Sequence, residues 1–346
     1  MTAARYLGLA VAIWTATASS AQDALKLEKP AVAIVPTRSP GNAFGDEVGE
    51  FEFRIEARRA CKGRIVWRIA AGTATVKAGE VAFDAAANLP KPIAIKVNLP
   101  PIKDGVILAT RLTLAAIEED QIKPVATFEQ NLWLFPKDPF ADRVEWLKKL
   151  QITLYDPKGD TAKVLSEAKV PFEEARDLDA LLATNAGLIL VGEGLAFKEE
   201  KGLSATLHKL ATGGRTVLIL APAAGEVAIP GIGGPIAGLR DLSFRSEIVR
   251  TLDKRLDPDG WLPDGKAVAS TLVVKMGDGT VGGEFLPGPG GWPWVEARAT
   301  AGKGRWALCG LGIIAKWNAG PTPRFLFARM LEYLTEPEQP KKENER

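Results

Sequence analysis

The side chains that most often carry nucleophilic catalysis are few in this chain and lie far apart along it. The 346 residues include one histidine, His208, and two cysteines, Cys61 and Cys309. A Ser–His or Cys–His mechanism needs the imidazole within hydrogen-bond reach of the nucleophile. His208 stands in the helix-like stretch KGLSATLHKLATGG, whereas Cys309 stands in the apolar run RWALCGLGII, which indicates a buried strand. We therefore predict no catalytic residue, interpret His208 as a helix-surface residue and expect two unpaired buried thiols.

The same scarcity of ligands argues against a metal site or a cofactor. Zinc and most transition metals need histidine or cysteine ligands. The segment RLDPDGWLPDG (255–265) offers the oxygen ligands that calcium prefers, but it lacks the spacing and the distal glutamate of an EF-hand. No glycine-rich run completes a dinucleotide or phosphate motif. We expect no metal and no cofactor.

Acidic side chains leave one hydrolytic chemistry open. Hydrolysis by a carboxylate pair needs two acids roughly 5 to 10 Å apart across the substrate. The candidates are Asp156, Glu193, Asp257 and Glu284. They can act together only if folding assembles them, and the favoured interpretation is that they are solvated loop carboxylates.

A small-ligand site is possible where an apolar run ends. Gly192, Glu193 and Gly194 directly follow GLILV, at the carboxyl end of an expected strand, where open α/β sheets bind ligands. Close packing at the strand end is the favoured interpretation of the two glycines, and a small-ligand site is the alternative.

Three tryptophans are further candidates for ligand contact: Trp261, Trp292 and Trp294. An indole face suits the C–H surface of a sugar, and its N–H can donate a hydrogen bond. Trp292 and Trp294 stand in PGPGGWPW and share one face of the expected strand WVEARA by period two. The favoured interpretation is a structured hairpin with at least one ring over the core, and a ligand site comes second.

The elements that must position these residues fall into two groups. Residues 31–137 alternate apolar and polar side chains in about seven short runs separated by Gly, Pro, Asp and Asn, which is typical of an immunoglobulin-like β-sandwich. Residues 138–149 are expected to form a linker helix. Residues 150–336 alternate apolar strands with amphipathic helices, which predicts a parallel sheet covered on both faces. Residues 227–304 are less regular and richer in Gly and Pro.

The two ends of the chain carry their own signals. Arg5, the apolar stretch 7–14 and a small-residue site ending at Ala21 predict a signal peptide over residues 1–21, followed by a linker over 22–30. The apolar stretch is shorter than the roughly 20 residues of a membrane span, and an uncleaved anchor is the alternative. Residues 337–346 are expected to be disordered. The protein should then be secreted or periplasmic, with no membrane span.

Two stretches resemble known families. The stretch IAIKVNLPPIKDGVILATRLTLAA, together with VATFEQNLWLFPK, which contains Trp133 and Pro136, resembles the last three strands of immunoglobulin-like domains in relatives of glycoside hydrolase family 2. AGKGRWALCGLGIIAKWNAGPTPRFLFARMLEYL resembles the end of a class I glutamine amidotransferase-like domain, which implies a three-layer, flavodoxin-like (Rossmann-like) α/β fold. The turn after RTVLILAP has neither the Cys nor the Ser nucleophile of active relatives, and the chain is too short for a catalytic barrel.

The resemblance therefore implies the accessory part of a sugar-active protein without its catalytic part. We expect a secreted, non-catalytic binding or scaffolding protein associated with polysaccharide processing, whose partner is an exported protein or a polysaccharide. The alternative is a carboxylate-dependent hydrolase, or another sugar-active enzyme, with its site at the carboxyl ends of the α/β strands. With net charge +2 and interleaved signs, the chain shows no nucleic-acid footprint. The oligomeric state stays open.

The interpretation of PGPGGWPW as a structural hairpin makes a prediction. Trp292→Ala should leave binding to a glycan or protein partner unchanged while the fold stays intact. A glycan array measures the binding, and circular dichroism verifies that the variant is folded. A variant that folds but no longer binds would make Trp292 a ligand residue.

Overall fold

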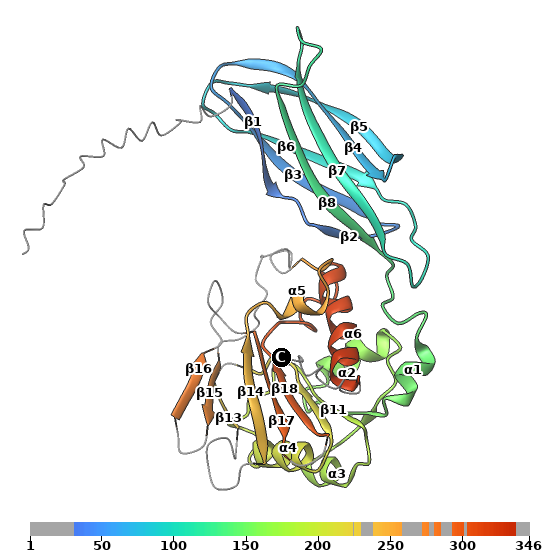
Figure 1. Ribbon diagram of the computed structural model, residues 1–346, viewed down its shortest axis with the longest axis vertical. Helices are drawn as coiled ribbons and strands as arrows, with labels where there is room; N and C mark the ends of the chain where they lie inside the picture. The colour runs from blue at the N-terminus through green and yellow to red at the C-terminus, as the bar shows by residue number, and fades with distance from the viewer. Residues whose placement is uncertain are drawn as a thin grey trace, which may run out of the picture.

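The protein folds into a β-sandwich followed by a mostly parallel α/β domain, as the sequence predicts (Figure 1). The computed structural model describes residues 31–223, 225–229, 238–257, 272–276, 280–284, 293–300 and 303–336. In this part of the chain, no helix is both long and apolar enough to cross a bilayer.

The sandwich consists of two sheets whose inner faces form one core. The first sheet holds β1 (Val32–Arg38), β3 (Val48–Ala57) and β6 (Lys91–Asn98), and the second holds β2 (Asn42–Phe44), β8 (Ala126–Phe135), β7 (Leu108–Glu118), β4 (Cys61–Ala71) and β5 (Ala74–Ala85). In β3, Phe51, Phe53 and Ile55 point into the core. The charged residues that alternate with them, such as Glu50, face outward. The seven predicted strands are confirmed. The sequence pattern missed β2, since three residues are too few for alternation to be recognised.

The α/β domain is a three-layer structure. Its large sheet has the spatial order β10 (Glu173–Glu174), β9 (Ile152–Tyr155), β11 (Leu188–Val191), β12 (Thr216–Ile219), β18 (Arg305–Cys309), β17 (Trp294–Ala299) and β14 (Leu239–Arg245). The first five are parallel and follow the order 2-1-3-4-5 of flavodoxin-like sheets. One face is covered by α1 (Val144–Lys149), α2 (Asp160–Glu167), α5 (Ile248–Leu252) and α6 (Pro321–Thr335), the other by α3 (Leu178–Ala183) and α4 (Leu203–Thr212).

The stretch 227–304 is more regular in its described parts than its composition indicates. Two antiparallel strands, β17 and β14, extend the large sheet beyond β18, and the predicted strand WVEARA is β17. A separate small sheet contains β13 (Gly225–Ile229), β15 (Leu272–Met276) and β16 (Thr280–Glu284). Pairing with a neighbouring strand imposes the extended conformation that Gly- and Pro-rich sequence does not favour by itself.

The two domains share one hydrophobic cluster. Phe135, the last residue of β8, is fully buried against Phe325 of α6, and the two rings meet edge to face with centroids 4.6 Å apart. Phe140 in the connecting segment packs in the same way on Phe327, at 6.3 Å. The core of the α/β domain therefore continues into the end of the sandwich that holds β2 and the last residue of β8.

Arg324 of α6 contacts residues on both sides of this junction. Its guanidinium lies 4.8 Å from the ring centroid of Phe44 in β2 and 5.9 Å from that of Trp317. It donates hydrogen bonds to the carbonyl oxygens of Lys137, at 3.0 Å, and Trp317, at 2.9 Å. One side chain thus binds the sandwich, the connecting segment and the loop before α6.

The shared cluster makes a testable prediction. Phe135→Ala should destabilise the protein by about 3 to 5 kcal/mol and should increase hydrogen exchange in α6, which lies in the other domain. Phe53→Ala is the matched control, since Phe53 is equally buried but packs on Phe128 within the sandwich. Hydrogen exchange read by mass spectrometry checks this. Equal protection of α6 in Phe135→Ala and wild type would contradict a shared core.

Candidate functional site

The predicted ligand site lies where β9 and β11 end. Gly192 follows β11, and its N–H donates to the carbonyl of Tyr155 at 2.9 Å. A Cβ at this position would clash with the carboxylate of Asp156. Gly194 has a φ of +79°, the left-handed conformation that favours glycine, and its N–H donates to the carbonyl of Ala221 at 2.7 Å. Gly192 is explained by close packing and Gly194 by a turn.

Glu193 is not a solvated loop carboxylate, and that expectation was wrong. The residue is 8% exposed, and its two carboxylate oxygens accept hydrogen bonds from the main-chain N–H groups of Ile314, at 2.7 Å, and Ala315, at 3.0 Å. Its own N–H donates to Thr161 Oγ1 at 2.9 Å. The carboxylate therefore holds the loop between β18 and α6, which sequence could not indicate because the partners lie more than a hundred residues away.

The protonation of Glu193 reflects two opposed effects. Burial raises its pKa, because the charged form loses its hydration, and the hydrogen bonds from Ile314 and Ala315 lower the pKa without cancelling the effect of burial.

The other candidate acids also have structural partners. Asp156 Oδ2 accepts the N–H of Ala162 at 2.8 Å and so caps the first turn of α2. Asp257 Oδ2 accepts the N–H of Gly41 in the sandwich at 3.2 Å. The side chain of Glu284 lies outside the described residues. Asp156 and Glu193 are neighbours at the strand ends, while Asp257 serves the contact between the domains.

Of the three candidate tryptophans, only Trp294 falls within the described residues; Trp261 and Trp292 lie outside them. Trp294 is fully buried, and its Nε1 donates to Glu296 Oε2 at 3.0 Å. Its ring packs on Tyr333 with centroids 6.3 Å apart. Trp294 is thus the ring that lies over the core, and it has no face free for a ligand.

Sequence reasoning missed Glu296, the centre of this buried network. Glu296 Oε1 accepts the hydroxyl of Tyr333 at 2.9 Å and is paired with Arg245. Burial works against ionisation, but the hydrogen bond from Trp294 and the charge of Arg245 outweigh it, so the pKa of Glu296 lies below its ordinary value. The carboxylate is ionised and fully engaged, which marks it as structural.

The cysteines and the histidine also lack a catalytic setting. Both cysteines are free and buried, as expected, and burial raises the pKa of Cys309 to about 12. His208 lies half-buried on α4, and burial lowers the pKa of its imidazole. Nucleophilic cysteines need the opposite environment, which stabilises the thiolate.

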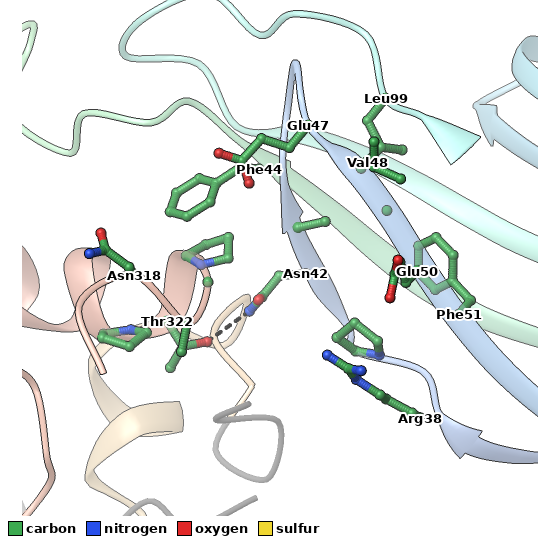
Figure 2. A pocket seen from close by; sticks show the side chains of 17 residues that line it. Arg38, Asn42, Phe44, Glu47, Val48, Glu50, Phe51, Leu99, Asn318 and Thr322 are labelled. Carbon is green, nitrogen blue, oxygen red and sulfur yellow. Dashed lines mark hydrogen bonds between the residues drawn. The ribbon is translucent and has the colours of Figure 1, made fainter. Parts of the chain in front are cut away.

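A concave site in the described structure is a cleft between the two domains, beside their shared core. Its volume is about 270 Å³. Figure 2 shows Arg38, Asn42, Glu50 and Phe51 of the sandwich on one side, with Thr322 and the loop before α6 on the other. Asn42 Nδ2 donates to Thr322 Oγ1 at 3.0 Å, a hydrogen bond that joins the two sides of the cleft (Figure 2).

The charged side chains of the cleft are paired on the sandwich surface. Glu50 Oε1 accepts from Lys96 Nζ at 2.7 Å, and the charge of Arg38 adds to that of Lys96 in lowering the pKa of Glu50. Glu47 lies 3.5 Å from Lys137 Nζ. Arg38 differs, because its Nε is buried and has no hydrogen-bond partner among the described residues.

Sequence reasoning did not select these cleft residues. Alternation in EFEFRIEARR predicts that Glu50 faces outward, which is correct, but it does not tell which outward side chain faces another domain. The residues opposite come from the far end of the chain.

Comparisons with known proteins show only distant likeness. No family model matches the chain, and no curated protein matches it. A cycloisomaltooligosaccharide glucanotransferase from Paenibacillus sp. is 8% identical with a TM-score of 0.28, over 55% of this chain and 28% of the glucanotransferase. The fibronectin(III)-like modules of CbhA from Clostridium thermocellum are 11% identical with a TM-score of 0.20, over 30% of this chain and 94% of theirs. The CARDB domain of the PF1109 protein from Pyrococcus furiosus is 16% identical with a TM-score of 0.20, over 31% of this chain and 94% of that domain.

The role of Glu193 makes a testable prediction with a definite sign. Because its folded-state pKa is raised above 4.5, the folded protein binds more protons than the unfolded chain, and stability falls as pH rises from 4.5 through the folded pKa. Glu193→Gln should remove this slope and, since one main-chain N–H loses its acceptor, weaken the fold by about 1 to 3 kcal/mol. The advantage of wild type over the variant should therefore shrink as pH rises.

Urea unfolding at several pH values from 4.5 to neutrality measures this difference. Glu167→Gln, which changes an exposed carboxylate at the end of α2, is the control. A wild-type advantage that grew with pH would contradict a raised pKa.

Proposed function

We propose that this protein is an exported, non-catalytic binding or scaffolding protein whose ligand is a polysaccharide or another exported protein. The signal-peptide pattern of residues 1–21 supports export to the periplasm or the medium. The finer resemblance to the accessory region of glycoside hydrolase family 2 relatives belongs to this proposal.

One observation carries the non-catalytic part. The two acids at the strand ends, Asp156 and Glu193, both bind main-chain N–H groups. A hydrolytic pair needs one carboxyl to donate a proton and the other to accept a proton or attack the substrate. Carboxylates already engaged with N–H donors, one of them 8% exposed, serve neither role well.

The interdomain cleft supports the binding part. It lies at a domain boundary, a common place for ligand sites, and combines apolar side chains with a few polar ones. We place the ligand there rather than at the strand ends, where Gly192 packs against Asp156.

The runner-up function is a carboxylate-dependent hydrolase, and one experiment separates the two. The full chain is applied to a glycan array and to a pull-down from the secreted fraction, and the glycans it binds are incubated with it and analysed for shortened products. We expect reproducible binding and no products.

Asp156→Asn sharpens the comparison, because its amide oxygen can still accept the N–H of Ala162. If wild type shortened a bound glycan and Asp156→Asn did not, the protein would be an enzyme and the proposal would be wrong. A chain that bound neither glycans nor proteins would equally contradict it.

A further inference from the structure

We infer that the interdomain cleft binds a short segment of an uncharged, hydroxyl-rich ligand, a neutral saccharide. This inference rests on the proposed function and adds to it the class of ligand and the residues that select it.

Both domains contribute walls to the cleft, so a ligand there would contact both. Arg38 of β1 and Glu50 of β3 face it from the sandwich, while Asn318 and Pro321 line it from the α/β domain (Figure 2). The volume of about 270 Å³ is near the lower end of ordinary ligand pockets, which begin at roughly 300 Å³. The cleft therefore fits a short segment of a ligand.

Arg38 and Glu50 provide complementary hydrogen-bonding groups next to each other. A guanidinium only donates hydrogen bonds, and an ionised carboxylate only accepts them. The Nε of Arg38 is covered by protein atoms, but the side chain as a whole is 38% exposed, and its Nη1 lies 3.8 Å from Glu52 Oε1, beyond hydrogen-bond distance. A ligand hydroxyl at the exposed end of the guanidinium would therefore supply an acceptor that Glu52 does not.

The balance of charge selects against charged ligands. The charged residues that line the cleft are of both signs, Arg38 with Glu47 and Glu50, and the two carboxylates are paired with Lys137 and Lys96. An anionic group approaching Arg38 would meet Glu50, and an ammonium group approaching Glu50 would meet Arg38 and Lys96.

A hydroxyl group suits both members of the pair. It accepts a hydrogen bond from Arg38 and donates one to Glu50 at the same time. Beside the pair, Val48 is 57% exposed and provides an apolar surface, which matches the C–H faces between the hydroxyls of a sugar ring. A neutral saccharide meets every one of these requirements.

Isothermal titration calorimetry of the full chain tests the inference. The neutral probes are maltotriose, cellotriose and N,N′,N″-triacetylchitotriose, and the charged probes are trigalacturonate and the fully deacetylated chitosan trimer. We expect at least one neutral trisaccharide to bind and both charged trimers to bind more weakly. Arg38→Met and Glu50→Gln should each weaken that binding by about tenfold or more, because each removes a hydrogen bond to a charged group.

Arg54→Met and Glu56→Gln are matched controls, since this ion pair on β3 has an N–O distance of 2.7 Å and lies outside the cleft. They should keep the wild-type affinity, and circular dichroism verifies that all four variants fold.

Saccharide binding that survived both Arg38→Met and Glu50→Gln would overturn the cleft as the binding site while leaving the non-catalytic function standing. Tighter binding of a charged trimer would overturn the neutral class. If wild type bound no saccharide but retained a protein partner in the pull-down, this inference would fail and the proposed function would remain.

Discussion

The apolar junction between Phe135 and the N-terminal part of α6 is the contact on which the rest of the structure depends. Phe135 ends the last strand of the sandwich, yet it belongs to the same cluster as Phe325 and Phe327 of the α/β domain. Full burial of an aromatic side chain stabilises a fold by about 1.5 to 3 kcal/mol, so pulling the domains apart would expose several such rings to water. Arg324 adds a hydrogen bond to the carbonyl of Lys137 across the same junction. The cleft beside the junction therefore has two walls whose separation is set by a packed core.

In the α/β domain, buried carboxylates stabilise contacts between segments that lie far apart in the sequence. Glu193 binds the loop after β18, Glu296 joins β17 to Tyr333 of α6, and Asp253 pairs with Arg255 and Arg329. A buried carboxylate without donors would be very unfavourable, so each one lies where N–H or O–H groups converge. The loop held by Glu193 leads directly to Asn318 and the start of α6, which form one wall of the cleft. Glu193, predicted as a ligand contact, therefore positions the loop that forms this wall.

The sequence predicted the helices and strands well where the apolar pattern is regular. It predicted them less well where a strand forms only because it pairs with a segment far away in the sequence. The strands of the sandwich and the apolar strands of the parallel sheet have strong periodicity, and they were located correctly. The short strand β2 exists because it pairs with the end of β8, next to the contact between Asn42 and Thr322. The surroundings of Trp294 depend on Glu296 and Tyr333, of which only Glu296 is near it in sequence.

By itself the sequence determined the fold class, the order of the two domains and the scarcity of histidine and cysteine, because these follow from local patterning and composition. Only the tertiary structure decided the roles of the individual side chains. Whether Glu193 is solvated or buried, and whether Arg38 and Glu50 face water or a second domain, depends on segments that lie far away along the chain. Hydrophobic periodicity reports the environment of a residue within its own element, whereas a site between two domains arises from surfaces that meet only after both have folded.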